Sequence, residues 1–206
     1  MSEFPGEDGK AALAAAAREI EAASDAEVVI AVRPQSGSYR DADLLAGVAA
    51  ALATLGFQLF SPWEFELEWI FVETVLVGVA GATLSSRMPP LRRLLTTARR
   101  RGEAVHAAAC MLFHEKGIAE TARRTGILIY VSLLERTAEV LPDSGVVGRV
   151  EAKAWAERIA AIQEAVRRRA PATELAARIL ALKAPLAAKL PRTAGDVDEL
   201  ADEMIS

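Results

Sequence analysis

The carboxylates beside two expected strands are the residues best suited to hold a divalent cation. Asp143 follows an apolar strand in the segment PDSG, and loops that follow strands collect functional side chains in α/β folds. Glu135 and Glu27 add further oxygens, as do their neighbours in sequence Asp25 and Glu139. Calcium needs six to eight oxygen ligands, so a calcium site requires several of these carboxylates to converge. The alternative is that Asp143 is an ordinary turn residue and the glutamates are solvated.

A second group of candidate ligands is His106, Cys110 and His114, which a spacing of four residues places on one helix face. Neighbouring pairs along such a helix are able to bind zinc. His106 and His114 are separated by about 80° around the helix axis, so the three side chains do not readily bind one ion. The alternative is that Cys110 packs in the core with a histidine at either edge.

Motifs that carry enzymatic chemistry are absent from the sequence. It contains neither a GxxxxGK(S/T) loop nor a GxGxxG loop for phosphates, and it has no GxSxG nucleophile elbow. We therefore predict no catalytic residue and no organic cofactor.

Composition narrows the class of protein. Hydrophobic residues make up 52% of the 206 residues, which excludes a disordered chain. The net charge of −4 argues against a nucleic-acid-binding protein, because such proteins are normally basic. Cys110 is the single cysteine, so no internal disulfide forms. The first residues lack a basic region followed by an apolar run, and we expect no signal peptide.

Two apolar runs predict a membrane hairpin over residues 44–86. Leu44–Phe60 has 17 residues without a charge, which is near the lower limit for a membrane-spanning helix. Trp69–Leu84 contains one charge, Glu73, which we expect near the interface or paired across the hairpin. The alternative is a helical hairpin in a soluble protein that oligomerises through its apolar face.

Tryptophans and glycines at suitable positions support the membrane hairpin. Trp63 and Trp69 lie in and beside the link SPWEFELE, where interfacial tryptophans are expected. Glycines let two membrane helices approach closely. Four are suitably placed for this, namely Gly47 and Gly56 in the first helix and Gly78 and Gly81 in the second.

Arginines predict the orientation of the hairpin. Six follow the second apolar run, at positions 87, 92, 93, 99, 100 and 101, and the link has no Lys or Arg. Arg33 and Arg40 precede the first run. The positive-inside rule therefore places the hairpin in the inner membrane with both termini in the cytoplasm. The arginine run is also a candidate for binding anionic lipid head groups. The predicted membrane anchor comprises Trp63, Trp69, Glu73, Arg87, Arg92 and Arg93.

The rest of the chain predicts an α/β domain that the hairpin interrupts. Strands are expected over residues 26–33, 126–133 and 137–141. Helices are expected over residues 10–24, 99–116, 152–169 and 172–190, with a short turn at 119–124 and a kink at Pro185. The acidic tail from Gly195 has an apolar helical face and is expected either to fray or to dock on a partner.

The segment Phe113–Val146, FHEKGIAETARRTGILIYVSLLERTAEVLPDSGV, resembles the TPM domain family. The features that carry the resemblance are a Thr-Gly before a hydrophobic strand, the strand and turn ILIYVSLLER, and the exit VLPDSGV. The stretch AASDAEVVIAVRPQSGSY resembles the family's first helix-to-strand unit. The apolar pair resembles a bacterial subgroup in which a membrane hairpin interrupts the domain after its first strand. The likeness covers roughly residues 10–170.

The resemblance implies an α/β/α sandwich with a small mixed sheet of about four strands, interrupted by a two-helix transmembrane hairpin. Residues 1–43 and 87–170 would form the two parts of the TPM-like domain, residues 44–86 the hairpin, and residues 171–206 a C-terminal helix and tail. Family members are linked to phosphatase activity, divalent-cation binding, and assembly or repair of membrane complexes. Many members place the domain outside the cytoplasm, and the arginine pattern of this chain departs from that.

Two functions stay open at this point. The first is a membrane-tethered, non-enzymatic accessory or scaffold factor, whose partners are the lipid bilayer and an unidentified membrane protein complex, with no nucleic acid. The alternative is a metal-dependent phosphatase with Asp143 in its site.

Overall fold

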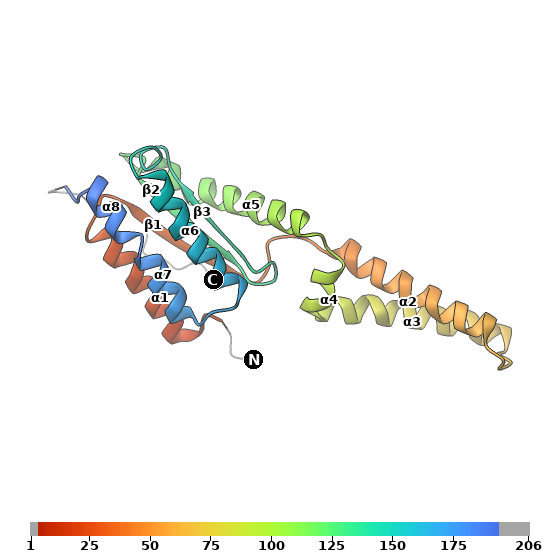
Figure 1. The fold of residues 1–206 in the computed structure, drawn as a ribbon. Helices are drawn as coiled ribbons and strands as arrows, with labels where there is room; N and C mark the ends of the chain where they lie inside the picture. The colour runs from red at the N-terminus through yellow and green to blue at the C-terminus, as the bar shows by residue number, and fades with distance from the viewer. Residues whose placement is uncertain (1–3, 194–206) are drawn as a thin grey trace. The chain divides into compact units, whose positions relative to one another are not determined.

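The computed structural model describes residues 4–193, which form two compact units (Figure 1). Residues 4–36 and 102–193 form one of them, which we call the α/β unit. Gly37–Arg101 form the other, which we call the hairpin unit. The hairpin unit is therefore an insertion between the first strand of the α/β unit and the rest of that unit.

A small mixed sheet lies at the centre of the α/β unit. Its strands are β1 (Glu27–Arg33), β2 (Gly126–Ser132) and β3 (Thr137–Pro142), in the order β1-β2-β3. β1 pairs with β2 in parallel, and β2 pairs with β3 antiparallel. The three strands predicted from the sequence are confirmed. The described residues form three strands, where the family resemblance implied about four.

Both faces of the sheet are buried, because β2 is apolar at every position up to Val131. Ile127 and Ile129 point into one core, and Leu128 and Tyr130 point into the other. Such a continuous apolar run is typical of a central strand covered on both faces. All seven residues of β2 are buried.

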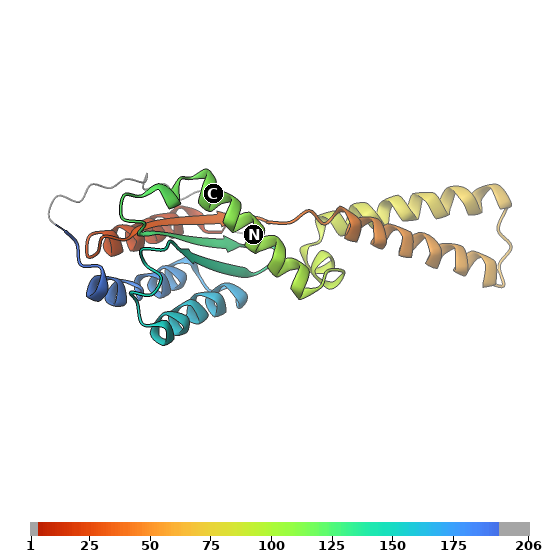
Figure 2. The ribbon, with the colours of Figure 1, turned by 90° about the horizontal axis from the view of Figure 1, so that it is seen from above.

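Helices form a layer on each side of the sheet (Figure 2). One core holds Leu13 and Ile20, Ile162, Ile179 and Leu186. These residues come from α1 (Gly6–Glu21), α6 (Ala152–Arg167), α7 (Ala172–Leu180) and α8 (Lys183–Lys189). The other core lies under α5 (Ala98–Glu115), with the 3-10 turn η1 (Ile118–Glu120) at its end.

The C-terminal helical segment departs from the prediction. A single helix over residues 172–190 with a kink at Pro185 was expected, but the chain breaks between α7 and α8, before the proline. Pro185 is the third residue of α8, in the first turn, where its missing N–H is not needed. Leu182 is fully buried at the break. The tail from Gly195 lies outside the described residues.

The hairpin unit contains α2 (Arg40–Phe60), α3 (Leu67–Arg87) and the short α4 (Pro89–Leu94). α2 and α3 extend beyond the predicted apolar runs at the ends away from the link. The unit also begins before residue 44 and ends after residue 86, because polar residues that flank the runs pair with one another. Residues 172–190, which were predicted to follow the TPM-like domain, contribute to the core of the α/β unit.

Gly126 tests the close contact between the start of β2 and η1. A Cβ atom there would lie 2.4 Å from the carbonyl oxygen of Ile118, so Gly126→Ala should lower the free energy of unfolding by about 1–3 kcal/mol. Gly102→Ala is the matched control, because a Cβ there meets nothing within 4 Å and removes the entropy cost of a helical glycine. It should raise stability by about 0.5–1 kcal/mol. Denaturant unfolding of the full chain in micelles measures both, and shifts of equal sign would contradict the packing.

Candidate functional site

Small residues line the contact between α2 and α3. A Cβ atom on Gly47 would lie 2.7 Å from the carbonyl oxygen of Gly78 and 2.9 Å from Cβ of Ala82. One on Gly81 would lie 2.8 Å from Cβ of Ala50. The two helices therefore pack backbone against backbone, as small-residue interfaces in membranes do. Gly56 was expected to take part, but a Cβ there would meet nothing within 4 Å, because it lies off this contact.

Large apolar side chains point outward from the same two helices. Phe60 is 89% exposed, Phe71 is 73% exposed, and Leu52 and Leu76 are exposed by 62% and 61%. Both helices are long and apolar enough to cross a membrane, by length and composition. The described residues bury 17% of the apolar window of α2 and none of that of α3. The hairpin therefore has its small residues inside and its large apolar residues outside.

A polar contact joins the helices near the link. Nε2 of Gln58 donates to Oε2 of Glu73 over 2.7 Å, and Oγ1 of Thr74 donates to Oε1 of Gln58 over 3.2 Å. Gln58 is 5% exposed, so its amide is satisfied inside the hairpin. Glu73 therefore pairs across the hairpin, which was one of its two expected placements.

Ion pairs close the other end of the hairpin. Nε and Nη2 of Arg92 donate to the two carboxylate oxygens of Asp43 over 3.0 and 2.6 Å, and Oγ of Ser85 donates to the first of these oxygens. Asp43 is 8% exposed, and Ser85 is fully buried. Arg100 makes a second two-pronged contact with Asp41. These pairs join segments on either side of the apolar runs.

The predicted anchor residues thus divide into two groups. Trp63 and Trp69, near the link, are 67% and 57% exposed, and Arg87 is exposed at the end of α3. Arg92 is instead held by Asp43. Arg101, outside that predicted set, donates to the carbonyl oxygens of Arg93 and Thr96. Part of the basic run therefore has a structural role that the charge count alone did not reveal.

The predicted cation ligands are divided between the two ends of the sheet. Glu27 lies opposite Gly126, and the backbone N–H of Asp143 donates to the carbonyl oxygen of Gly126 over 2.8 Å. Glu27 and Asp143 therefore flank the same end of β2. Glu135 lies in the turn after Ser132, about 20 Å away along the strand. The three carboxylates cannot form one site, because β3 carries the chain from Glu135 at one end of the sheet to Asp143 at the other.

Asp143 is a buried residue with one oxygen engaged. Its Oδ1 accepts the backbone N–H of Ser144 over 2.6 Å and lies 3.8 Å from Nη1 of Arg124. Its Oδ2 is buried without a hydrogen-bond partner among residues 4–193. A bound cation would give this oxygen a partner, but its site would not include Glu135, and the calcium prediction for Asp143 and Glu27 stays a prediction. Within the described residues, no group of three His, Cys, Asp or Glu side chains is arranged to hold a metal ion.

Glu135 is instead part of a buried network of hydroxyl groups. Its Oε1 accepts the backbone N–H of Ser36 over 3.0 Å, and its Oε2 accepts the hydroxyl of Ser132. The hydroxyl of Ser36 contacts those of Tyr130 and Ser132, at 3.0 and 2.8 Å. Glu135 is 3% exposed, so this network satisfies a carboxylate that would otherwise be costly to bury.

Asp25 ties the start of β1 to two distant segments. Its carboxylate accepts the backbone N–H and the hydroxyl of Thr193 over 2.7 and 2.6 Å, and it pairs with Arg123. Burial alone would raise the pKa of Asp25, but the Thr193 hydrogen bonds and the charge of Arg123 outweigh it and hold the pKa below its ordinary value. Asp25 is therefore engaged within the fold.

The three candidate soft-metal ligands on α5 do not meet at one point. Sγ of Cys110 lies 3.6 Å from Nε2 of His106, and Nδ1 of His106 lies 2.5 Å from Oε1 of Glu139. His114 packs edge-on against Phe113 instead. The contact between α5 and β3 was missed in the sequence, because it depends on where the helix lies over the sheet.

Comparison with known proteins gives a likeness of fold. The chain matches no protein-family model and no curated protein. The NMR structure of BA42 protein from the psychrophilic bacterium Bizionia argentinensis is similar, with a TM-score of 0.60 and 18% sequence identity. The match covers 100% of this chain and 97% of that chain. At this identity the likeness concerns the fold alone.

Gly47 tests the packing of the hairpin. Gly47→Leu should separate α2 from α3, because its side chain would collide with the backbone of Gly78, and we expect a loss of about 1–3 kcal/mol. Gly56→Leu is the matched control, because the space beside Gly56 is open. Detergent-induced unfolding, followed by the fluorescence of Trp63 and Trp69 in a Trp155→Phe background, measures both variants. Equal losses would contradict the helix contact.

Asp25 predicts an acid-sensitive contribution to stability. Because its folded-state pKa lies below the ordinary value of 3.8, the carboxylate stabilises the fold above that value and loses this effect as the pH falls through the folded pKa. Asp25→Asn should cost about 1–3 kcal/mol at neutral pH and less at a pH below 3.8. Denaturant unfolding at both pH values measures this. A loss equal to that of the exposed control Glu157→Gln would contradict the assignment.

Proposed function

We propose that this chain is a membrane-tethered α/β domain of the TPM type, with the hairpin unit crossing the inner membrane and both termini in the cytoplasm. In this proposal it acts as a non-enzymatic accessory or scaffold factor for a membrane protein complex. The observation that carries the proposal is the inverted packing of the hairpin. Small residues fill the contact between α2 and α3, while Phe60, Phe71 and Leu76 point outward.

The energetics of water exposure favour a lipid environment for this surface. A soluble helical hairpin gains stability by burying its large apolar side chains, each contributing about 1.5–3 kcal/mol. Here those side chains are exposed along both helices, whereas soluble proteins rarely expose large contiguous apolar patches. In lipid, exposing the same side chains costs no free energy. Close packing of the two backbones then becomes the source of helix association.

The dimensions of α2 and α3 support a full crossing. Each has 21 residues, so each is about 31 Å long at 1.5 Å per residue. The hydrocarbon core of a bilayer is about 30 Å thick. Polar groups gather at both ends of this length: the Asp43–Arg92 pair at one end, and Trp63 and Trp69 near the link at the other.

The order of elements supports the TPM assignment. A helix and a strand precede the insertion, and a helix, two strands and further helices follow it. The mixed sheet has β1 parallel to β2, with β3 antiparallel at its edge. The accessory role rests on the sequence resemblance to that family and on the tether itself.

Charge on the outward face of α3 should abolish membrane retention. Leu76→Arg with Val79→Arg places two guanidinium groups near the middle of the helix, at about 2.5–3.5 kcal/mol each. We expect the native chain to stay in the membrane pellet after alkaline carbonate washing and the double variant to leave it. Ala156→Arg with Ala160→Arg, on an exposed side of α6, is the matched control and should stay in the pellet.

The outcome that contradicts the proposal is release of the native chain by carbonate as a monodisperse soluble particle.

The single cysteine adds a test of orientation. An impermeant thiol reagent applied to intact spheroplasts should miss Cys110 and should label a Ser61→Cys chain in which Cys110 is Ser. The opposite labelling pattern would overturn the predicted topology.

A further inference from the structure

Three side chains on α5 and β3 form a connected line. The thiol of Cys110 lies 3.6 Å from Nε2 of His106, and the other ring nitrogen lies 2.5 Å from Oε1 of Glu139. One tautomer satisfies both contacts: Nδ1–H donates to Glu139, and Nε2 accepts the thiol proton. This is the order of groups in an activated nucleophile, in which a base contacts the nucleophile and a third group orients the base.

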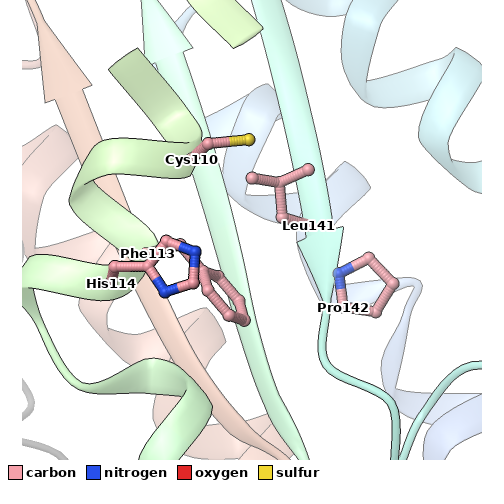
Figure 3. A pocket seen from close by; sticks show the side chains of 5 residues that line it. All are labelled: Cys110, Phe113, His114, Leu141 and Pro142. Atoms are coloured by element: carbon pink, nitrogen blue, oxygen red, sulfur yellow. The ribbon is translucent and has the colours of Figure 1, made fainter. Parts of the chain in front are cut away.

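A surface pocket lies beside the thiol (Figure 3). Its volume is about 200 Å³, and its lining comprises Cys110, Phe113, His114, Leu141 and Pro142. Glu139 and Leu141 are two residues apart on β3, so they point to the same side of the strand, toward α5. Cys110, at the end of the connected line, therefore lies in the wall of a pocket lined largely by apolar side chains.

We propose that Cys110 is a nucleophilic thiol that accepts a short acyl group from a thioester bound in this pocket. His106 takes the thiol proton, and Glu139 is a positioning residue that holds the imidazole in the required tautomer. The apolar side chains of Phe113 and Leu141 receive the acyl chain.

The reaction balances with these groups and the thioester alone. The proton of Cys110 moves to Nε2 of His106, and the sulfur attacks the thioester carbonyl carbon to form a new C–S bond. The C–S bond of the donor then breaks, and the departing thiolate takes the proton from His106. The products are S-acyl Cys110 and a free thiol, with no oxidation or reduction.

The chain supplies a matched control for this site. Glu115 is exposed at the end of α5 and is not among the residues that line the pocket. Glu115→Gln therefore makes the same carboxylate-to-amide change as Glu139→Gln, on the helix that carries Cys110 but outside the connected line.

The test uses S-phenyl thioacetate and the full chain in lipid discs at neutral pH. Mass spectrometry of the intact chain measures acetylation, a Cys110→Ser chain gives the background from lysine amines, and thiophenol release gives the rate. We expect His106→Gln and Glu139→Gln each to slow acetylation of Cys110 by about tenfold or more. Glu115→Gln should keep the native rate. The double variant His106→Gln, Glu139→Gln should be no slower than His106→Gln alone, because Glu139 acts through His106.

Rescue by a conservative variant separates positioning from a merely structural effect. Glu139→Asp keeps a carboxylate and should recover part of the acetylation rate that Glu139→Gln loses, while circular dichroism stays unchanged in both variants. The side chains of His106 and Glu139 are partly exposed, so the fold should persist. The proposal is overturned if His106→Gln reacts at the native rate, or if Glu115→Gln slows the reaction as much as Glu139→Gln does.

Discussion

Helices α2 and α3 contact each other through glycine and alanine. This contact determines which side chains of the hairpin unit are buried and which are exposed. Because Gly47 approaches the backbone of Gly78, there is no room between the helices for the leucines and phenylalanines of the same segments. Those side chains point outward. Exposure of such a surface to water costs free energy, whereas membrane helices normally present large apolar side chains to lipid. The proposed tether follows from this packing more than from hydropathy alone.

The polar ends of the hairpin let it interrupt a domain. Asp43 and Arg92 are far apart in sequence, but the hairpin returns the chain to its starting point, and their two-pronged contact joins the two flanks. In the α/β unit, β1 from before the insertion pairs in parallel with β2 from after it, along seven residues. The sheet of the α/β unit is therefore complete although the hairpin unit lies between its first two strands in the sequence.

Local patterns were enough to predict the elements, and tertiary contacts explain what was missed. The strands at Glu27–Arg33 and Gly126–Ser132 follow from their apolar, β-branched runs. The break before Pro185 was missed, because good helix formers continue through it and buried Leu182 determines the local packing. The separation of Glu135 from Asp143 follows from the length of β3, which lies between them. The contact of His106 with Glu139 depends on where α5 lies over the sheet.

Depth-dependent fluorescence quenching tests the central claim most directly. Leu76 lies near the middle of α3 and is 61% exposed, so a tryptophan there reports the surroundings of the hairpin surface. The three native tryptophans are replaced by phenylalanine, and the Leu76→Trp chain is reconstituted with lipids brominated at different depths. Quenching strongest for bromines near the acyl-chain ends is the predicted result, because α3 crosses the bilayer. Quenching by an aqueous reagent, with none from the lipid bromines, would contradict the account.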